Sequence, residues 1–131
     1  MADGLLYLDA SALVKLVRAK LESDALLREL DGWHEQLTSV VAEVEVRRLA
    51  WRARVLERAD AVLAELSLVE LDEPVRRLAG RVGPSLRSLD AIHLASALSL
   101  GNDLGGFCCY DRRLNAEAAA AGLPIVAPGL D

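Results

Sequence analysis

Apolar residues along the chain alternate between short runs and stripes with helical spacing. Five short runs are predicted to be strands, at residues 5–8, 36–39, 67–71, 107–110 and 124–127. Between them, apolar residues recur at helical spacing over residues 11–18, 21–30, 40–64 with a break, beyond Pro74, 89–100 and 112–121. Strands that alternate with helices predict an α/β fold, in which helices cover both faces of a central parallel sheet of four to five strands.

Three residues with strong end preferences mark helix boundaries in this pattern. Pro74 stands near the start of a helix, where its missing N–H costs nothing. Ser88 is expected to be the N-cap of the helix over 89–100, which is almost entirely apolar or small and is therefore expected to be buried. Gly122 is expected to close the helix over 112–121 as its C-terminal cap.

The composition indicates one globular domain over residues 1–131, of which 53% are hydrophobic and 27% charged. No apolar run approaches the ~20 residues of a membrane span, and the N-terminus lacks the basic region of a secretory signal. The only cysteines, Cys108 and Cys109, are adjacent, which predicts no disulfide framework. These features favour a cytoplasmic protein with no membrane contact.

The net charge of −5 at pH 7 argues against a general nucleic-acid coat protein, which would be strongly basic. It is compatible with a nuclease in which acids hold metal ions. The positive charge is nearly all arginine, since Lys15 and Lys20 are the only lysines. Arginine offers a planar fork suited to phosphate, although a high arginine content can also follow from genome base composition.

Two acids, Asp9 and Asp111, each stand at the end of a predicted strand. In open parallel sheets, ligands bind beyond the carboxyl ends of the strands. Two acids that meet there would repel each other without a cation, and hard divalent cations prefer oxygen ligands. The alternative is that each acid only caps the helix that follows it.

Asp90 lies in the first turn of the apolar helix over 89–100. It could simply complement the helix dipole, but an acid on a buried helix needs a partner, which a metal ion would supply. His93 lies one helical turn further on the same face and is expected to be a packed, hydrogen-bonded residue rather than a ligand. Glu43 and Glu45 compete as a further acid. Glu43 has Arg47 at i+4, which favours Glu43, weakly, as the solvated one.

Four segments together resemble the PIN-domain family and, within it, the VapC toxins of toxin–antitoxin pairs. They are LYLDASALVKL around Asp9, TSVVAEVEVRR around Glu45, LRSLDAIHLASAL around Asp90 and YDRRLNAEAAAAGLPIVAP from Tyr110. They occur in the order of the family and extend over about residues 5–128. The resemblance implies a three-layer α/β/α fold and a site made by Asp9, Glu45, Asp90 and Asp111, with Glu45 selected over Glu43 by its V-E-V context. Ser11, two positions after the first acid, would support the site by bonding a carboxylate or a ligand water.

The resemblance also implies an activity and partners. The activity is hydrolysis of RNA phosphodiester bonds to leave a 5′-phosphate and a 3′-hydroxyl, with one or two Mg²⁺ or Mn²⁺ ions at the four acids. The implied partners are RNA and a VapB-type antitoxin, in a homodimer or a toxin–antitoxin hetero-oligomer. In one departure from the family pattern, Cys109 stands where members often carry Thr or Ser.

Contacts with RNA are less specified by the sequence. Arg112 and Arg113 follow Asp111 and could bind phosphate, whereas a second group is expected to form a solvated, salt-bridged helix: Arg47, Arg48, Arg52, Arg54 and Arg58. Trp33 and Trp51 are expected in the core or at an interface. The alternative function is a catalytically inactive PIN-like module that binds a protein. A haloacid-dehalogenase phosphatase is disfavoured, because it needs a second Asp where Ser11 stands, and phosphate-binding glycine motifs are missing.

Overall fold

Five parallel strands form one sheet in the order β3-β2-β1-β4-β5, in a computed structural model that describes residues 4–130. The strands are β1 (Leu5–Leu8), β2 (Glu35–Ser39), β3 (Ser67–Val69), β4 (Leu104–Cys108) and β5 (Ile125–Val126). β1 lies in the middle and pairs with β2 on one side and β4 on the other. The predicted parallel α/β sheet is confirmed, with five strands.

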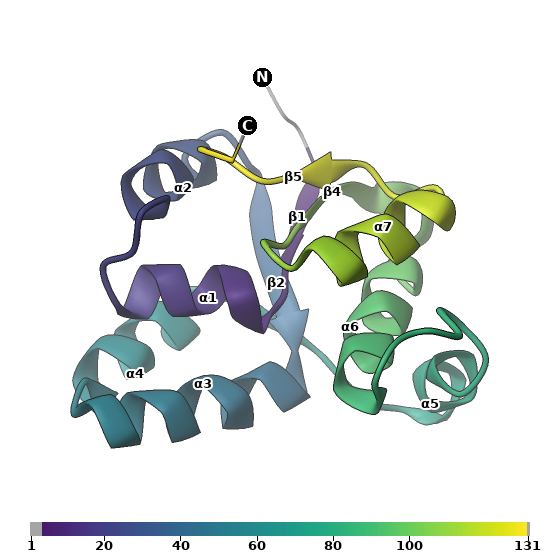
Figure 1. The fold of residues 1–131 in the computed structure, drawn as a ribbon, viewed down its shortest axis with the longest axis horizontal. Helices are drawn as coiled ribbons and strands as arrows, with labels where there is room; N and C mark the ends of the chain where they lie inside the picture. The colour runs from purple at the N-terminus through teal and green to yellow at the C-terminus, as the bar shows by residue number, and fades with distance from the viewer. Residues whose placement is uncertain (1–3, 131) are drawn as a thin grey trace.

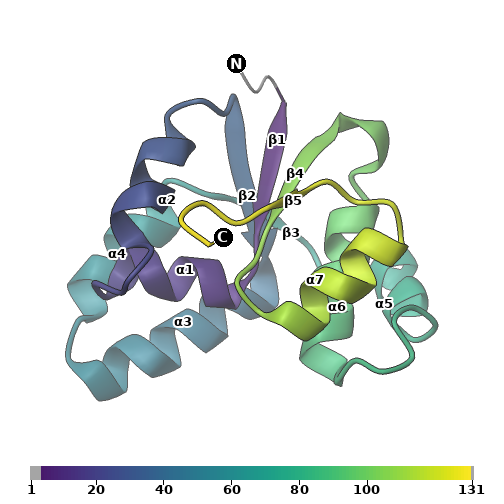
Figure 2. The same cartoon turned by 45° about the horizontal axis from the view of Figure 1, so that its top comes forward.

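Helices cover both faces of the sheet, as Figure 1 shows. On one side lie α1 (Ala10–Val17), α2 (Ser23–Leu30), α3 (Val40–Ala53) and α4 (Leu56–Ala64). On the other lie α5 (Glu73–Ala79), α6 (Ser88–Leu98) and α7 (Arg112–Ala120), and a short 3₁₀ helix, η1 (Gly101–Asp103), leads into β4. The helices and the sheet thus make the predicted three layers, and the turned view in Figure 2 separates the two helical layers clearly.

The alternation of side chains along β1 explains why there are two cores. Leu6 and Leu8 point to the layer of α1–α4, whereas Tyr7 points to the layer of α5–α7. All three side chains are completely buried. Tyr7 stacks on Phe107 of β4, with the ring centroids 5.7 Å apart. β1 is therefore buried on both faces, as the continuous apolar run at its position in the sequence predicted.

Several predicted boundaries differ from the structure. β4 begins at Leu104 rather than at residue 107, because Gly105 and Gly106, which have turn preferences, lie inside the strand. A Cβ at Gly106 would lie 2.8 Å from Trp33 and from Val126, so glycine is needed for this close approach. The prediction that Ser88 is an N-cap is wrong, because Ser88 is the first residue of α6 and Arg87 takes the cap position without a side-chain bond.

Other local predictions have mixed outcomes. The expected break within residues 40–64 occurs at Arg54, whose φ of 62° ends α3 in the left-handed region. Gly122 follows the last turn of α7 with a φ of 92° and donates to Ala119 O, which confirms it as the helix end. Trp51 is not in the core, because it is 62% exposed, whereas Trp33 is half-buried against the α1–α4 layer. Across residues 4–130, no helix has the length and apolarity needed to cross a bilayer.

Candidate functional site

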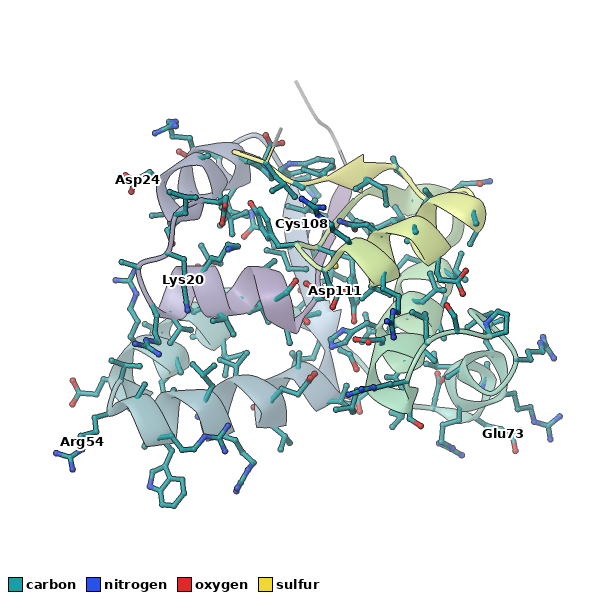
Figure 3. The ribbon with its side chains drawn as sticks, viewed as in Figure 1. Lys20, Asp24, Arg54, Glu73, Cys108 and Asp111 are labelled. Carbon is teal, nitrogen blue, oxygen red and sulfur yellow. The ribbon has the colours of Figure 1, made fainter. Side chains whose placement is uncertain are left out.

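The four predicted acids lie on elements that begin near the carboxyl edge of the sheet. Asp9 directly follows β1 and Asp111 lies shortly after β4, while Glu45 stands in the second turn of α3 and Asp90 in the first turn of α6. Figure 3 places Asp111 at the N-terminal end of α7, near the N-terminal end of α1. Because α1, α3 and α7 start here, their positive dipole ends favour carboxylate and phosphate groups at this edge.

Asp9 is buried and held by its own turn. Its Oδ1 accepts a hydrogen bond from Ser11 Oγ at 2.7 Å and from Ala12 N at 3.0 Å, so it does cap α1. Burial raises the pKa of the Asp9 carboxyl, while nearby His93 and these hydrogen bonds oppose that rise. Ser11 Oγ also accepts from Tyr110 N at 2.9 Å. Ser11 therefore ties the turn after β1 to the segment after β4, and bonds a carboxylate as predicted.

Asp90 and Asp111 line one hollow of about 350 Å³ together with Arg87, Arg112 and Arg113. Loss of solvent raises the pKa of Asp90, and the negative charges of Asp111 and Glu45 raise it further. Asp111 and Glu45 therefore both act electrostatically on Asp90, although His93 and Arg87 partly offset the effect. This is the crowding of like charges that a cation would relieve.

Glu45 and Glu43 face different partners. Glu43 Oε2 lies 3.4 Å from the guanidinium of Arg47, on the solvated side of α3. Glu45 Oε1 lies 2.8 Å from Nε2 of His93, whose ring is almost completely buried. The expected ion pair of Glu43 is present, and Glu45 is the glutamate that faces α6.

His93 continues this contact into the core, because its Nδ1 lies 2.7 Å from the hydroxyl of Tyr7. His93 is thus packed and hydrogen-bonded, as expected, but its link from Tyr7 to Glu45 was not predicted. The available clues were its position one turn after Asp90 and the position of Tyr7 two residues before Asp9. Arg87, which lines the same hollow as the two acids, was also missed.

Cys109 lies inside the site rather than beside it. Its Sγ accepts from the backbone N of Asp111 at 3.3 Å and lies 3.7 Å from Ser11 Oγ. Burial raises the pKa of the Cys109 thiol far above its usual range, and the negative charge of Asp9 adds to the rise. Cys109 is therefore a neutral thiol that bridges Ser11 and the Asp111 turn with weak hydrogen bonds.

The chemistry of the acids fits a hard cation such as Mg²⁺, which takes oxygen ligands. In residues 4–130, however, no three His, Cys, Asp or Glu side chains converge as a ready metal site. Asp9 is turned toward Ser11 and Glu45 toward His93, while Asp90 and Asp111 border the hollow. The four-acid ligand set therefore stays a prediction.

Comparison with known proteins decides the family. A model of the PIN domain matches residues 6–105. The chain is 44% identical over 126 residues to Ribonuclease VapC46 of Mycobacterium tuberculosis (strain ATCC 25618 / H37Rv), an alignment that covers 94% of this chain and 97% of that protein. The chain belongs to the VapC ribonucleases of the PIN-domain family. This VapC-family chain is also 44% identical over 132 residues to Ribonuclease VapC35 of the same strain, covering 95% and 98% of the two chains.

Solved structures share the fold of this VapC-family chain. Mycobacterium tuberculosis VapC20, described as a sarcin-ricin loop cleaving toxin, aligns with a TM-score of 0.73 and 17% identity over 94% of this chain and 99% of that one. A toxin–antitoxin complex from Klebsiella pneumoniae gives a TM-score of 0.73 and 19% identity over 94% and 97% of the two chains. The resemblance stated from the four sequence segments is thus confirmed at the level of family and fold.

Proposed function

We propose that this chain is an endoribonuclease that hydrolyses RNA phosphodiester bonds with Mg²⁺ or Mn²⁺ held by Asp9, Glu45, Asp90 and Asp111. The observation that carries the proposal is that Asp90 and Asp111 line one hollow at the carboxyl edge of the sheet, where the charges of Asp111 and Glu45 raise the pKa of Asp90. The names of the VapC relatives support the same activity.

The four acids differ in position and in how their side chains are held. Asp90 and Asp111 border the hollow and are the acids best placed to meet a phosphate that enters it. Asp9 is kept in one orientation by Ser11 and the start of α1, and Glu45 by His93. One or two divalent cations bound there would activate the attacking water and stabilise the leaving oxygen.

Arg112 and Arg113, together with Arg87, are the proposed phosphate contacts in the same hollow. Each guanidinium can donate two parallel hydrogen bonds to a phosphate. Their positive charges also offset the repulsion between an incoming phosphate and the acids. In this proposal, the arginines that bind the RNA phosphate and two of the acids that hold the metal therefore line the same hollow.

A VapB-type antitoxin is the proposed protein partner, in a toxin–antitoxin hetero-oligomer or beside a homodimer of this chain. The acids offer a binding place for an arginine inserted from such a partner, since carboxylates accept the guanidinium fork. Support comes from the Klebsiella pneumoniae neighbour, which is itself a toxin–antitoxin complex. A cytoplasmic location accompanies this proposal, because Cys108 and Cys109 are both free thiols.

Cleavage of total cellular RNA by the purified, antitoxin-free protein tests the proposal, with Mg²⁺, with Mn²⁺ and with EDTA. The informative variants are Glu45→Gln, Asp90→Asn and Asp111→Asn. Glu43→Gln is the matched control, because it removes the same charge two residues away on the same helix. We expect discrete products that require metal, that disappear in the three site variants and that persist in Glu43→Gln.

The opposite results separate the alternatives. Cleavage that survives EDTA would exclude the metal, and equal loss in Glu43→Gln and Glu45→Gln would exclude a specific role for Glu45. A folded protein that neither cleaves RNA nor binds Mn²⁺ would favour the catalytically inactive protein-binding module.

A further inference from the structure

A second hollow, of about 390 Å³, runs between α1 and α3 and opens beside the acids. It is lined by Ala10, Ser11 and Val14 of α1 and by Glu45, Arg48, Leu49 and Arg52 of α3. Two of these residues belong to the site already described, because Ser11 bonds Asp9 and Glu45 is one of the four acids. The hollow therefore borders the candidate active site.

The far part of this hollow carries two arginines with free guanidinium groups. Arg48 and Arg52 are both exposed, and within residues 4–130 neither takes part in an ion pair or a side-chain hydrogen bond. Of the other arginines in this region, Arg47 pairs with Glu43 and Asp60, and Arg58 donates to Leu16 O at 3.0 Å. Arg54, at the end of α3, is exposed and does not line the hollow. Within residues 4–130, the expectation of a salt-bridged helix is therefore confirmed for Arg47 alone among the five arginines of this region.

The order of these side chains along α3 shows how the hollow extends away from the acids. Glu45, Arg48 and Arg52 follow at i, i+3 and i+7 and so share one face of the helix. At a rise of 1.5 Å per residue, Arg52 lies about 10 Å along the axis from Glu45. In Figure 3, α3 extends away from the centre of the molecule toward Arg54 at its far end, while Asp111 stays at the centre.

The hollow of Asp90 and Asp111 is also lined by arginines, namely Arg87, Arg112 and Arg113. Glu45 thus lines one hollow and Asp90 and Asp111 line the other, and both hollows expose guanidinium groups in a chain whose net charge is −5. A ligand that touches both hollows must carry negative charges on both sides of the point that meets the acids. A nucleic-acid strand has this property, because each of its nucleotides carries a phosphate.

We propose that the hollow between α1 and α3 binds the single-stranded RNA on one side of the cleaved bond, with Arg48 and Arg52 on consecutive phosphates. This inference rests on the proposed ribonuclease function and extends it to the path of the substrate. Val14 and Leu49 form apolar walls that contact ribose and base edges. The hollow has no aromatic lining residue, so binding there is through the backbone and tolerates many sequences.

Binding of a labelled 30-nucleotide single-stranded RNA of mixed sequence tests the proposal directly. The RNA is titrated with full-length Asp90→Asn protein, which keeps the RNA intact, with and without Arg48→Ala/Arg52→Ala. The matched control is Arg76→Ala/Arg77→Ala on α5, which also removes two exposed positive charges from one helix. Cleavage by the same pairs in the wild-type background separates KM from kcat.

We expect the Arg48→Ala/Arg52→Ala variant to bind RNA about 10-fold more weakly than its parent. The slope of the logarithm of the RNA association constant against the logarithm of salt concentration should also become shallower, by about 1 for each phosphate that is no longer neutralised. In cleavage, the Arg48→Ala/Arg52→Ala variant should have a higher KM and a nearly unchanged kcat. The Arg48→Lys/Arg52→Lys variant should recover most of the RNA binding. The Arg76→Ala/Arg77→Ala control should bind RNA like its parent. Equal binding and equal salt slopes in the two pairs would overturn the proposal. Intact RNA binding with weakened binding of an acidic antitoxin segment would overturn it as well.

If the proposed ribonuclease function is wrong, the cleavage experiment gives a different result from the one expected if only the RNA-binding proposal is wrong. In that case the wild-type protein does not cleave RNA, or cleaves it without the acids. The binding titration still reports on the hollow, because it uses a protein that needs no activity.

Discussion

His93 Nε2 lies 2.8 Å from Glu45 Oε1, so a buried imidazole on α6 holds the carboxylate of a glutamate on α3. An ionised carboxylate only accepts hydrogen bonds, which assigns the proton to Nε2. On the other side of the ring, His93 Nδ1 lies 2.7 Å from the hydroxyl of Tyr7. Burial raises the pKa of the Tyr7 phenol far above its usual range, with the charge of Asp9 adding to it, so this hydroxyl remains a donor. The orientation of Glu45 is therefore set from the middle strand of the sheet.

Replacement of His93 should impair the site more than the fold. His93→Leu removes the donor to Glu45, and we expect a loss of about 10- to 100-fold in Mn²⁺ affinity or in kcat, the range found when residues that orient metal ligands are changed. His93→Gln retains an N–H donor and should recover part of the loss. Tyr7→Phe should have a smaller effect, because it leaves the Nε2–H in place. Calorimetric Mn²⁺ titration and kcat measure the effect.

A purely structural role of His93 predicts a different pattern. Mn²⁺ affinity would then be equal in the Leu and Gln variants, and any loss of activity would follow the loss of thermal stability.

Replacement of Asp9 by Asn should stabilise the metal-free protein at high pH. The raised pKa of Asp9 means that the folded state holds this proton to a higher pH than the unfolded chain does, so the free energy of unfolding falls as pH rises above the usual range of an aspartate. Asp9→Asn keeps an oxygen that can accept from Ser11 and Ala12 but has no charge to bury. Thermal unfolding in EDTA should show the variant more stable than wild type at pH 8, with the difference narrowing toward pH 4.

The control for this comparison is Asp72→Asn. Asp72 caps α5 in the same way, accepting from Val75 N at 3.1 Å, but it is exposed. If Asp72→Asn and Asp9→Asn change the pH dependence of stability equally, burial of Asp9 is not the cause.

Replacement of Gly106 by Ala should destabilise the protein by about 1–3 kcal/mol, as overpacking of a tight core does. A Cβ there would lie 2.8 Å from both Trp33 and Val126 and 3.0 Å from Leu6. Gly32→Ala is the control, since its nearest neighbour would be Glu29 O at an ordinary 3.6 Å. Urea unfolding measures both, and equal stability of the two variants would contradict the close packing of β4.

Both cysteines should resist thiol reagents in the folded protein. Cys108 and Cys109 are buried, and burial raises the pKa of each thiol, so the reactive thiolate is scarce. With a chromogenic disulfide at pH 8, we expect no rapid reaction in native buffer and two thiols per chain in denaturant. Rapid reaction of one native thiol would contradict the buried position of Cys109 in the site.

The positions of the strand-end acids were predictable from the sequence, whereas the directions of their side chains were not. Asp9 and Asp111 follow apolar strand segments, and strands of a parallel sheet end at a common edge. Where Asp9 points depends on Ser11, which is in turn held by Tyr110 N, 99 residues away. The Tyr7–His93 bond spans 86 residues. Periodicity reports which residues share a face of one element and carries no information on such pairs.

Predictions for single residues failed where the local preference of a residue did not decide its place in the structure. Ser88 has the chemistry of an N-cap, but α6 begins one residue earlier than that preference indicates. Gly105 and Gly106 have turn preferences, yet they lie in β4 because the strand passes close to Trp33 and Val126. At the glycines, tertiary packing overrides the local preference of the residue.

The place of β1 in the sheet has a consequence for the order of events during synthesis. β1 leaves the ribosome before β4, one of its two neighbours in the sheet, because residues 5–8 precede residues 104–108 in the chain, and Asp111 comes later still. A nascent chain that ends before Leu104 leaves one edge of β1 unpaired and lacks the fourth acid. The predicted four-acid site can therefore assemble only after Asp111 has left the ribosome, long after its first acid, Asp9, has been made.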